Sequence, residues 1–372
     1  MAANRQRLSV TEFDFDEVKD NLKLFMRNQT EFKDYDFEGS GLSALLDVLA
    51  YNTHYLGFNA NMLANEMFLD SSQLRSSVVS HAKTLGYTTR SATASNAVVD
   101  IILNTTNASA TMPAGTVFTA SVDDVSYQFV TIADATASNS GSTITFNDTR
   151  IYEGSYVSSR YVADTQNVEQ RFLINDNRAD TTTLSVVVQN SATDTIQTTF
   201  TQATDIAGLT STSNVYFIQE VEGGQYEIYF GDGILGSAIE DGNIIIMQYV
   251  VINKGAANGA STFTSSTAID TVNSVNVVTV SNSAGGSEPE SIESIKYNAP
   301  LDYASQGRCV TTEDYKTYVK QLFANTQAVS VWGGEDGSFN DVSGVSDVAE
   351  YGKVFISVKS TTGLNLNEVQ KA

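Results

Sequence analysis

Apolar residues change their spacing twice along this chain of 372 residues. In residues 1–90 they recur at three- and four-residue steps, which is typical of helices. In residues 91–284 short alternating runs are separated by Ser, Thr, Asn and Asp, which is typical of antiparallel strands. Helical and extended patterns alternate in residues 285–372. We therefore predict a multidomain α+β protein with an N-terminal helical bundle segment, a central antiparallel β-rich domain and an incomplete C-terminal α/β domain.

The helical segment is predicted to contain three helices. Asp14 or Asp16 can cap the first of them. Ser40 caps the second, which covers residues 41–68 and is about 40 Å long at about 1.5 Å per residue. The third covers residues 71–85. The second helix is the most informative, because it carries two apolar stripes and only two short helices of the same segment are predicted to cover them.

Apolar residues lie on two opposite sides of this second helix. Leucines repeat every seven residues on one side, and a mostly aromatic stripe lies roughly opposite. Two interpretations stay open: helices of other chains cover the stripes, or the helix is buried inside a self-sufficient three-helix domain. On the first interpretation, Asn52 and Asn59 set the register of a bundle. The candidate interface residues are Leu42, Leu49, Leu56, Leu63, Tyr51, Tyr55, Phe58 and Met62.

Short strands are predicted throughout the middle region. The clearest hairpin joins residues 215–221 to 225–230 through a Glu-Gly-Gly turn. Residues 244–252 are apolar on both faces, so we expect them to form a central strand. Residues 260–284 are predicted to be an extended connection to the last domain, with a strand-like cluster of valines. Other strands are expected at residues 98–103, 127–132, 183–189 and 196–200.

A helix is predicted to open the last domain. Ser287 and Glu290 form an S-x-x-E capping box at its start. Pro300 is predicted to end it, because a residue that precedes proline is pushed out of the helical region. Residues 301–308 would then be an ordered linker.

A second helix of this domain is predicted to start at Thr311 or Thr312. Strands are expected at residues 328–332 and 353–359, and the start of another helix near Asn365. This order of strand, loop, strand and helix lacks a returning strand. We therefore expect these residues to be the N-terminal part of a longer gene product.

Composition argues against several kinds of partner. The formal net charge is −22 and the Lys and Arg residues form no cluster, which argues against binding to nucleic acid or to an anionic membrane. Cys309 is the single cysteine, so an internal disulfide is excluded. No apolar run approaches the roughly 20 residues that cross a bilayer. We expect a globular protein that is made and folds in a reducing cytoplasm.

No pattern of residues favours a catalytic, cofactor or metal site. Residues 231–236 match G-x-G-x-x-G, but a turn and a strand are predicted after them, where a dinucleotide site needs a helix. His54 and His81 lack cysteines or carboxylates at metal-binding spacing. The 43 carboxylates leave a glycosidase pair open, although no spacing marks one. We predict no catalytic residue, no cofactor, no metal and no enzymatic activity.

Three stretches resemble a known family. Residues 285–315, GGSEPESIESIKYNAPLDYASQGRCVTTEDY, closely resemble the signature of the baseplate J family, the wedge proteins of contractile phage tails and related injection machines. Residues 226–259, YEIYFGDGILGSAIEDGNIIIMQYVVINKGAANG, resemble the same family. Residues 32–90 resemble the wedge proteins of T-even-type phages in particular.

The resemblance implies a structural subunit of the baseplate wedge in the virion tail, assembled in the host cytoplasm into a ring around the central hub. It also implies that the helical segment joins a bundle with a second copy of the chain and with other baseplate wedge proteins, next to the sheath-initiating baseplate protein. Conformational change of that ring would couple host attachment to sheath contraction. The alternative is a β-rich tail adhesin or a glycan-binding or depolymerising protein, which leaves the long N-terminal helix without a role.

Overall fold

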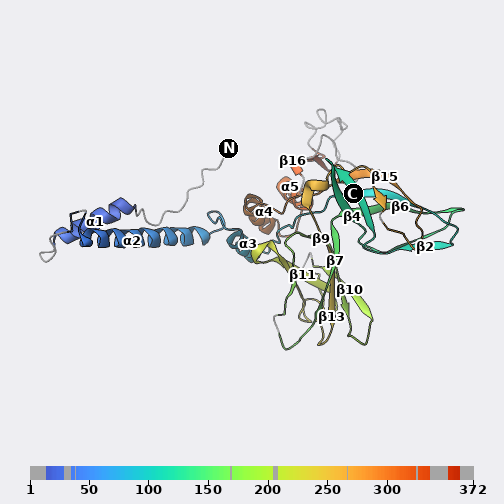
Figure 1. Ribbon diagram of the computed structural model, residues 1–372, viewed down its shortest axis with the longest axis horizontal. Helices are drawn as coiled ribbons and strands as arrows, with labels where there is room; N and C mark the ends of the chain where they lie inside the picture. The colour runs from blue at the N-terminus through green and yellow to red at the C-terminus, as the bar shows by residue number, and fades with distance from the viewer. Residues whose placement is uncertain are drawn as a thin grey trace. The chain divides into compact units, whose positions relative to one another are not determined.

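The computed structural model describes residues 14–28, 35–37, 39–167, 170–203, 208–265, 267–323, 326–335 and 351–360. The chain divides into two compact units, Met1–Thr84 and Leu85–Ala372 (Figure 1). The first unit is helical, and the second contains two large sheets followed by helices and a strand pair. This confirms the predicted α+β class. The predicted domain boundaries at residues 90 and 284 stay predictions.

Helices account for most of the described part of the first unit. The second of them starts as predicted, because the backbone N–H of Ser43 donates to the hydroxyl oxygen of Ser40 at 3.0 Å. The third starts later than predicted. There the backbone N–H of Gln73 donates to the Glu66 carboxylate at 2.8 Å, which holds the preceding residues in a turn. The helices are α1 (Phe15–Arg27), α2 (Gly41–Glu66) and α3 (Arg75–Thr84).

One sheet of the second unit has six strands in the order β14-β3-β4-β6-β1-β15, and all neighbours are antiparallel. Its last strand confirms the predicted strand-like cluster of valines in residues 275–284. What was not predicted is its place at the edge of this sheet, where Val277 pairs with Ile101 of β1. The strands are β1 (Asn96–Asn104), β3 (Val117–Val122), β4 (Val125–Val130), β6 (Thr143–Glu153), β14 (Thr264–Ser265) and β15 (Val275–Ala284); β2 (Ser109–Met112) and β5 (Ala135–Ser138) pair separately.

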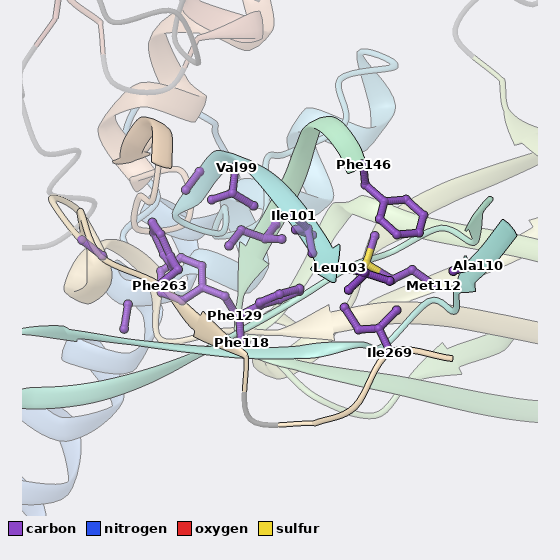
Figure 2. Close-up of a cluster of buried hydrophobic side chains, with 14 of the residues drawn as sticks. Val99, Ile101, Leu103, Ala110, Met112, Phe118, Phe129, Phe146, Phe263 and Ile269 are labelled. Atoms are coloured by element: carbon purple, nitrogen blue, oxygen red, sulfur yellow. The ribbon is translucent and has the colours of Figure 1, made fainter. Parts of the chain in front are cut away.

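Alternate residues of these strands fill a hydrophobic core. On β1, Val99, Ile101 and Leu103 are buried while the residues between them are partly exposed. This period of two is expected of a strand with one face against a core. Figure 2 shows these side chains gathered with Phe129, whose ring meets Phe263 edge-on at a centroid distance of 5.0 Å. Burial of each such side chain contributes about 1.5–3 kcal/mol.

The other large sheet has seven strands in the order β7-β13-β9-β10-β11-β12-β8. Residues 244–251 lie between β7 and β9, which confirms the predicted central strand. The predicted hairpin is confirmed as well, since Ile218 pairs with Ile228 across it. Only β10 and β11 among these pairs are parallel. The strands are β7 (Ser155–Val162), β8 (Phe172–Ile174), β9 (Ala179–Gln189), β10 (Gln197–Gln202), β11 (Val215–Glu220), β12 (Tyr226–Phe230) and β13 (Ile244–Val251).

Two helices follow, and the first differs from its prediction at both ends. α4 (Ile292–Ser305) is capped by Ser291, whose hydroxyl oxygen accepts from the backbone N–H of Ser294 at 3.2 Å. The predicted capping box of Ser287 and Glu290 is therefore wrong. The helix also continues through Pro300 to Ser305, so the predicted stop and linker are wrong. Burial of Ile295 and Ala299 on one side outweighs the single backbone hydrogen bond that proline gives up.

The second helix starts as predicted. In α5 (Thr312–Leu322) the Thr311 side chain accepts from the backbone N–H of Asp314, and the Asp314 carboxylate accepts from the backbone N–H of Thr311 at 2.8 Å. β16 (Thr326–Gly333) and β17 (Val354–Ser360) then pair antiparallel. The helix expected near Asn365 lies outside the described residues.

We call residues 85–95 the strap. Glu290 caps no helix because its carboxylate binds this segment instead. The Glu290 carboxylate is buried and accepts hydrogen bonds from the Tyr87 hydroxyl at 2.9 Å and from the Asn298 side-chain amide at 3.1 Å. Burial, together with the nearby Glu290 carboxylate, raises the pKa of Tyr87 well above its usual range. Glu290 thus ties the strap to α4.

Two more buried carboxylates hold the strap against the seven-stranded sheet. Asp180 of β9 accepts from the backbone N–H of Ala94 at 2.7 Å. Glu220 of β11 accepts from the Thr89 hydroxyl at 2.5 Å. Buried charged groups are costly unless hydrogen-bonded, so each carboxylate favours one position of the strap.

Candidate assembly interface

The candidate interface is the surface of α2, a helix of 26 residues. Successive residues are turned by about 100° around a helix, so each position can be assigned to a face. Three faces result, separated by about 100–140°. The first contains Ser43, Leu46, Ala50 and Gly57, all of which are buried. The other two are the leucine stripe (Leu42, Leu49, Leu56 and Leu63) and the aromatic stripe (Tyr51, Tyr55, Phe58 and Met62).

α1 packs against the amino-terminal part of α2 (Figure 1). Small and medium residues on the buried face, such as Ser43 and Ala50, allow a close approach of the two helices. The Lys19 ammonium and the Asp47 carboxylate join them at 2.6 Å, with side chains 23% and 44% exposed. An ion pair that is exposed to water to this degree contributes only about 0–1 kcal/mol to stability. Packing on this one face therefore holds the helix pair together.

The leucine stripe is uncovered along most of its length within the described part of the unit. Leu49, Leu56 and Leu63 are 46%, 61% and 69% exposed, and Leu42 is half-buried. A strict seven-residue repeat drifts by about 20° per heptad around a straight helix, so these leucines stay on one side over four turns and more. Such a repeat is the pattern that packs against another helix in a coiled coil.

The aromatic stripe is uncovered as well. Tyr51 and Phe58 are each 60% exposed, Tyr55 is 53% exposed and Met62 is 44% exposed. The rings form a row, with centroid distances of 5.6 Å from Tyr51 to Tyr55 and 6.4 Å from Tyr55 to Phe58. Tyrosine and phenylalanine are enriched in the centres of protein interfaces.

Sequence reasoning missed two further exposed side chains of α2. Leu45 is 55% exposed and lies on the leucine stripe between Leu42 and Leu49. Val48 is 64% exposed and lies between the two stripes, on the side of Asn52 and Asn59. The signal that could have found Leu45 is its spacing of four residues from Leu49. The interface role of all these residues stays a prediction.

The residues considered above as candidates for a dinucleotide or metal site make structural hydrogen bonds. The Asp232 carboxylate accepts from the backbone N–H groups of Leu235 and Ile234, which lowers its pKa and closes a turn in the glycine-rich loop. β13 follows that loop, so no helix end faces a pyrophosphate there. His81 Nε2 lies 2.8 Å from the carbonyl oxygen of Glu66. Among the described residues, no three or more His, Cys, Asp and Glu side chains gather as metal ligands do.

No helix among the described residues is long and apolar enough to cross a membrane.

Three family descriptions match separate segments of this chain. Residues 14–87 match a family described as baseplate wedge protein gp6-like, helical domain. Residues 159–259 match the third domain of bacteriophage baseplate wedge protein gp6, and residues 311–372 match C-terminal domain I of baseplate structural protein gp6. Three separate segments of the chain thus match domains described for phage baseplate wedge proteins.

The relative found by sequence is the baseplate wedge protein gp6 of Enterobacteria phage T4. It is 31% identical to this chain over 391 residues, an alignment that covers 96% of this chain and 55% of the relative. The chain therefore spans about half the length of that protein. The resemblance to T-even wedge proteins is confirmed. The family descriptions that match are those of gp6, so they replace the baseplate J label.

A solved structure, the six-fold symmetrised cryo-EM baseplate of the anti-feeding prophage, matches with 13% sequence identity. It covers 87% of this chain and 67% of the matched chain with a TM-score of 0.31. A score that low supports no structural argument.

Proposed function

We propose that this chain is a structural subunit of the baseplate wedge of a contractile phage tail. The single observation that carries the proposal is the pair of exposed apolar stripes on α2, in a segment that matches the gp6-like helical domain. Exposed apolar surface of this extent is unfavourable in a lone soluble chain and marks an interaction site. The virion tail baseplate is the corresponding location.

The two stripes require covering helices, and the resemblance to baseplate wedge proteins implies which chains supply them. Each stripe accepts one helix, so α2 with α1 requires two further helices to cover it. A second copy of this chain and another baseplate wedge protein supply them, next to the sheath-initiating baseplate protein. Wedges joined in this way form a ring around the central hub, and conformational change of the ring couples host attachment to sheath contraction.

A structural role also explains the chemistry of the buried carboxylates. Glu290, Asp180 and Glu220 all accept hydrogen bonds from the strap, so their interactions hold segments together. The function that we propose is structural and invokes no catalysis, cofactor or metal.

The glycan-binding alternative rests on an aromatic row on the seven-stranded sheet. Phe217 and Tyr229 stack at a centroid distance of 5.2 Å, and the Arg171 guanidinium lies 4.6 Å from the centre of the Tyr229 ring. Phe217 and Arg171 come from β11 and from the start of β8, the strands on either side of β12. They therefore cover both faces of Tyr229, which leaves this ring no open face for a sugar. The row favours a structural role.

Purification of the tagged native protein from producing cells at low salt tests the proposal. Mass spectrometry and light scattering of the eluate should show other tail proteins and a mass above that of one chain. A lone monomer without tail proteins would contradict the wedge role. A glycan array probed with the same material would then test the adhesin alternative.

A further inference from the structure

The leucine stripe of α2 is part of a wider line of residues that we call the seam. Along the seam the steps between successive residues alternate between three and four, which is the spacing of the contact line in a coiled coil. The two asparagines of the seam lie about 60° around the helix from the leucines that precede them. The seam residues are Leu42, Leu45, Leu49, Asn52, Leu56, Asn59 and Leu63.

The seam is open to solvent over most of its length. Leu49, Leu56 and Leu63 are between 46% and 69% exposed, and Asn52 and Asn59 are exposed beside them. The buried face of α2, against which α1 packs, lies on another side of the helix. The seam therefore has room for a helix of another chain.

Charged side chains of α2 cannot select the helix that binds this seam. Between Asp47 and Glu66 the sequence contains no Asp, Glu, Lys or Arg. Ion pairs beside the contact line usually set partner choice and orientation in coiled coils, and this helix does not supply them. The choice of partner is left to the two polar residues of the seam, Asn52 and Asn59.

A buried asparagine is satisfied best by another amide, because the amide group both donates and accepts hydrogen bonds. In a parallel pair in register, each seam residue faces the same residue of a second copy, so all four asparagines are paired. A shift by seven residues would place Asn59 against Glu66 and Asn52 of the other copy against Leu45. In an antiparallel pair the two kinds of seam position face each other, so each asparagine would face a leucine.

We propose that the seam of α2 binds the seam of a second copy of this chain, as a parallel pair in register in which Asn52 and Asn59 hydrogen-bond to their counterparts. The inference rests on the proposed function, since it names the stripe that takes the second copy and the orientation of the pair. The asparagines determine specificity, because an amide in the seam lowers the stability of the pair but disfavours other registers more. The aromatic stripe lacks this pattern and is left for a different chain.

Disulfide cross-linking in producing cells, on tail complexes that contain the tagged full chain with Cys309→Ser, tests the orientation. Leu56→Cys should link two copies of the chain on mild oxidation, because a disulfide needs Cα atoms within about 7 Å, as equivalent seam positions of a parallel pair are. Phe58→Cys is the matched control. Its side chain is 60% exposed, against 61% for Leu56, but it lies on the aromatic stripe and should not link to itself.

Cells that produce two differently tagged cysteine variants detect the other arrangements. A disulfide between Leu45→Cys and either Leu56→Cys or Leu63→Cys would show an antiparallel pair, since positions 45 and 56 lie about 16 Å apart along a parallel pair in register. A disulfide between Leu49→Cys and Leu56→Cys would show a shift of seven residues. Each of these results would overturn the proposal.

The double variant Asn52→Leu, Asn59→Leu tests the asparagines themselves. It should keep the pairing but raise the fraction of such mixed disulfides about tenfold, because no buried amide is then left unpaired in the other arrangements. An unchanged fraction would show that the asparagines do not set the orientation.

Failure of this inference differs from failure of the proposed function. Tail proteins that co-purify with the chain, without a link at Leu56→Cys, would overturn the parallel pair and leave the wedge role supported. Absence of tail proteins from the complex would contradict the wedge role itself.

Discussion

α2 and β1 are both rich in aliphatic residues, but these residues differ in their exposure to solvent. Ile101 and Leu103 of β1 have no solvent exposure, whereas Leu56 and Leu63 of α2 are 61% and 69% exposed. β1 has one apolar face, and its own sheet and loops supply enough surface to cover it. α2 has three apolar faces, and within the described residues α1 is the helix that packs along it. The comparison motivates the proposal that partner helices cover the two exposed stripes of α2.

The largest effect is expected for Leu49→Asp, which tests whether the exposed leucine stripe of α2 is needed for assembly. A charge in the centre of the leucine stripe should abolish assembly with other tail proteins, because a buried unpaired carboxylate is strongly unfavourable. The second unit should stay folded, as measured by circular dichroism, since Leu49 lies outside it. Ile234→Asp adds the same charge to a side chain that is 74% exposed on the second unit, and should leave assembly intact. If Leu49→Asp assembles as wild type does, the proposed helical bundle is contradicted.

Phe129→Ala tests the buried core to which β1 contributes. This ring is fully buried, so its loss should lower the free energy of unfolding by about 3–5 kcal/mol in urea denaturation. Leu56→Ala on α2 should change the stability of the isolated chain by no more than about 0.5 kcal/mol. Equal effects of the two substitutions would mean that the leucine stripe is covered within one chain.

Glu290→Ala tests the strap. The change leaves the Tyr87 hydroxyl and the Asn298 amide without their buried acceptor, at about 1–3 kcal/mol for each unpaired group. Glu288→Ala is the matched control, because that side chain is 72% exposed and pairs only with Lys254 at the surface. Urea denaturation should separate the two variants by about 2 kcal/mol or more. Equal stabilities would show that the strap does not depend on Glu290.

The smallest expected effect is a change in the pH dependence of stability, caused by Glu153. Burial raises the pKa of Glu153, although its hydrogen bonds from Asn253 oppose the shift. A carboxyl group with a raised pKa in the folded state costs stability when it is ionised. Stability should therefore fall as pH rises from the ordinary carboxyl pKa of 4.5 through the raised value. Glu153→Gln should flatten that part of the pH profile of urea denaturation; an unaltered profile would assign it to other groups.

Local signals were sufficient for several elements. Ser40 and Thr311 were recognisable as helix caps, because a cap depends on hydrogen bonds within four residues. The hairpin around Glu222, Gly223 and Gly224 was equally local, and so was the all-round apolar character of α2.

The errors occurred where distant residues decide the structure. Ser287 and Glu290 have the spacing of a capping box, yet Glu290 accepts from Tyr87, about 200 residues earlier in the chain. Pro300 is a helix breaker by local rules, but α4 continues through it because Ile295 and Ala299 are buried by packing. For residues 275–284 the valines did predict a strand, but its pairing with β1 was not predictable from neighbouring residues.

The sequence by itself determined the α+β class, the long helix and its two apolar stripes, because periodicity and caps are properties of neighbouring residues. Only the tertiary structure decided which of those apolar residues are covered, since burial depends on segments far apart along the chain. It also decided that β6 pairs with β4 only at Phe129 and Val130, because the chain passes at Gly154 from β6 into a different sheet.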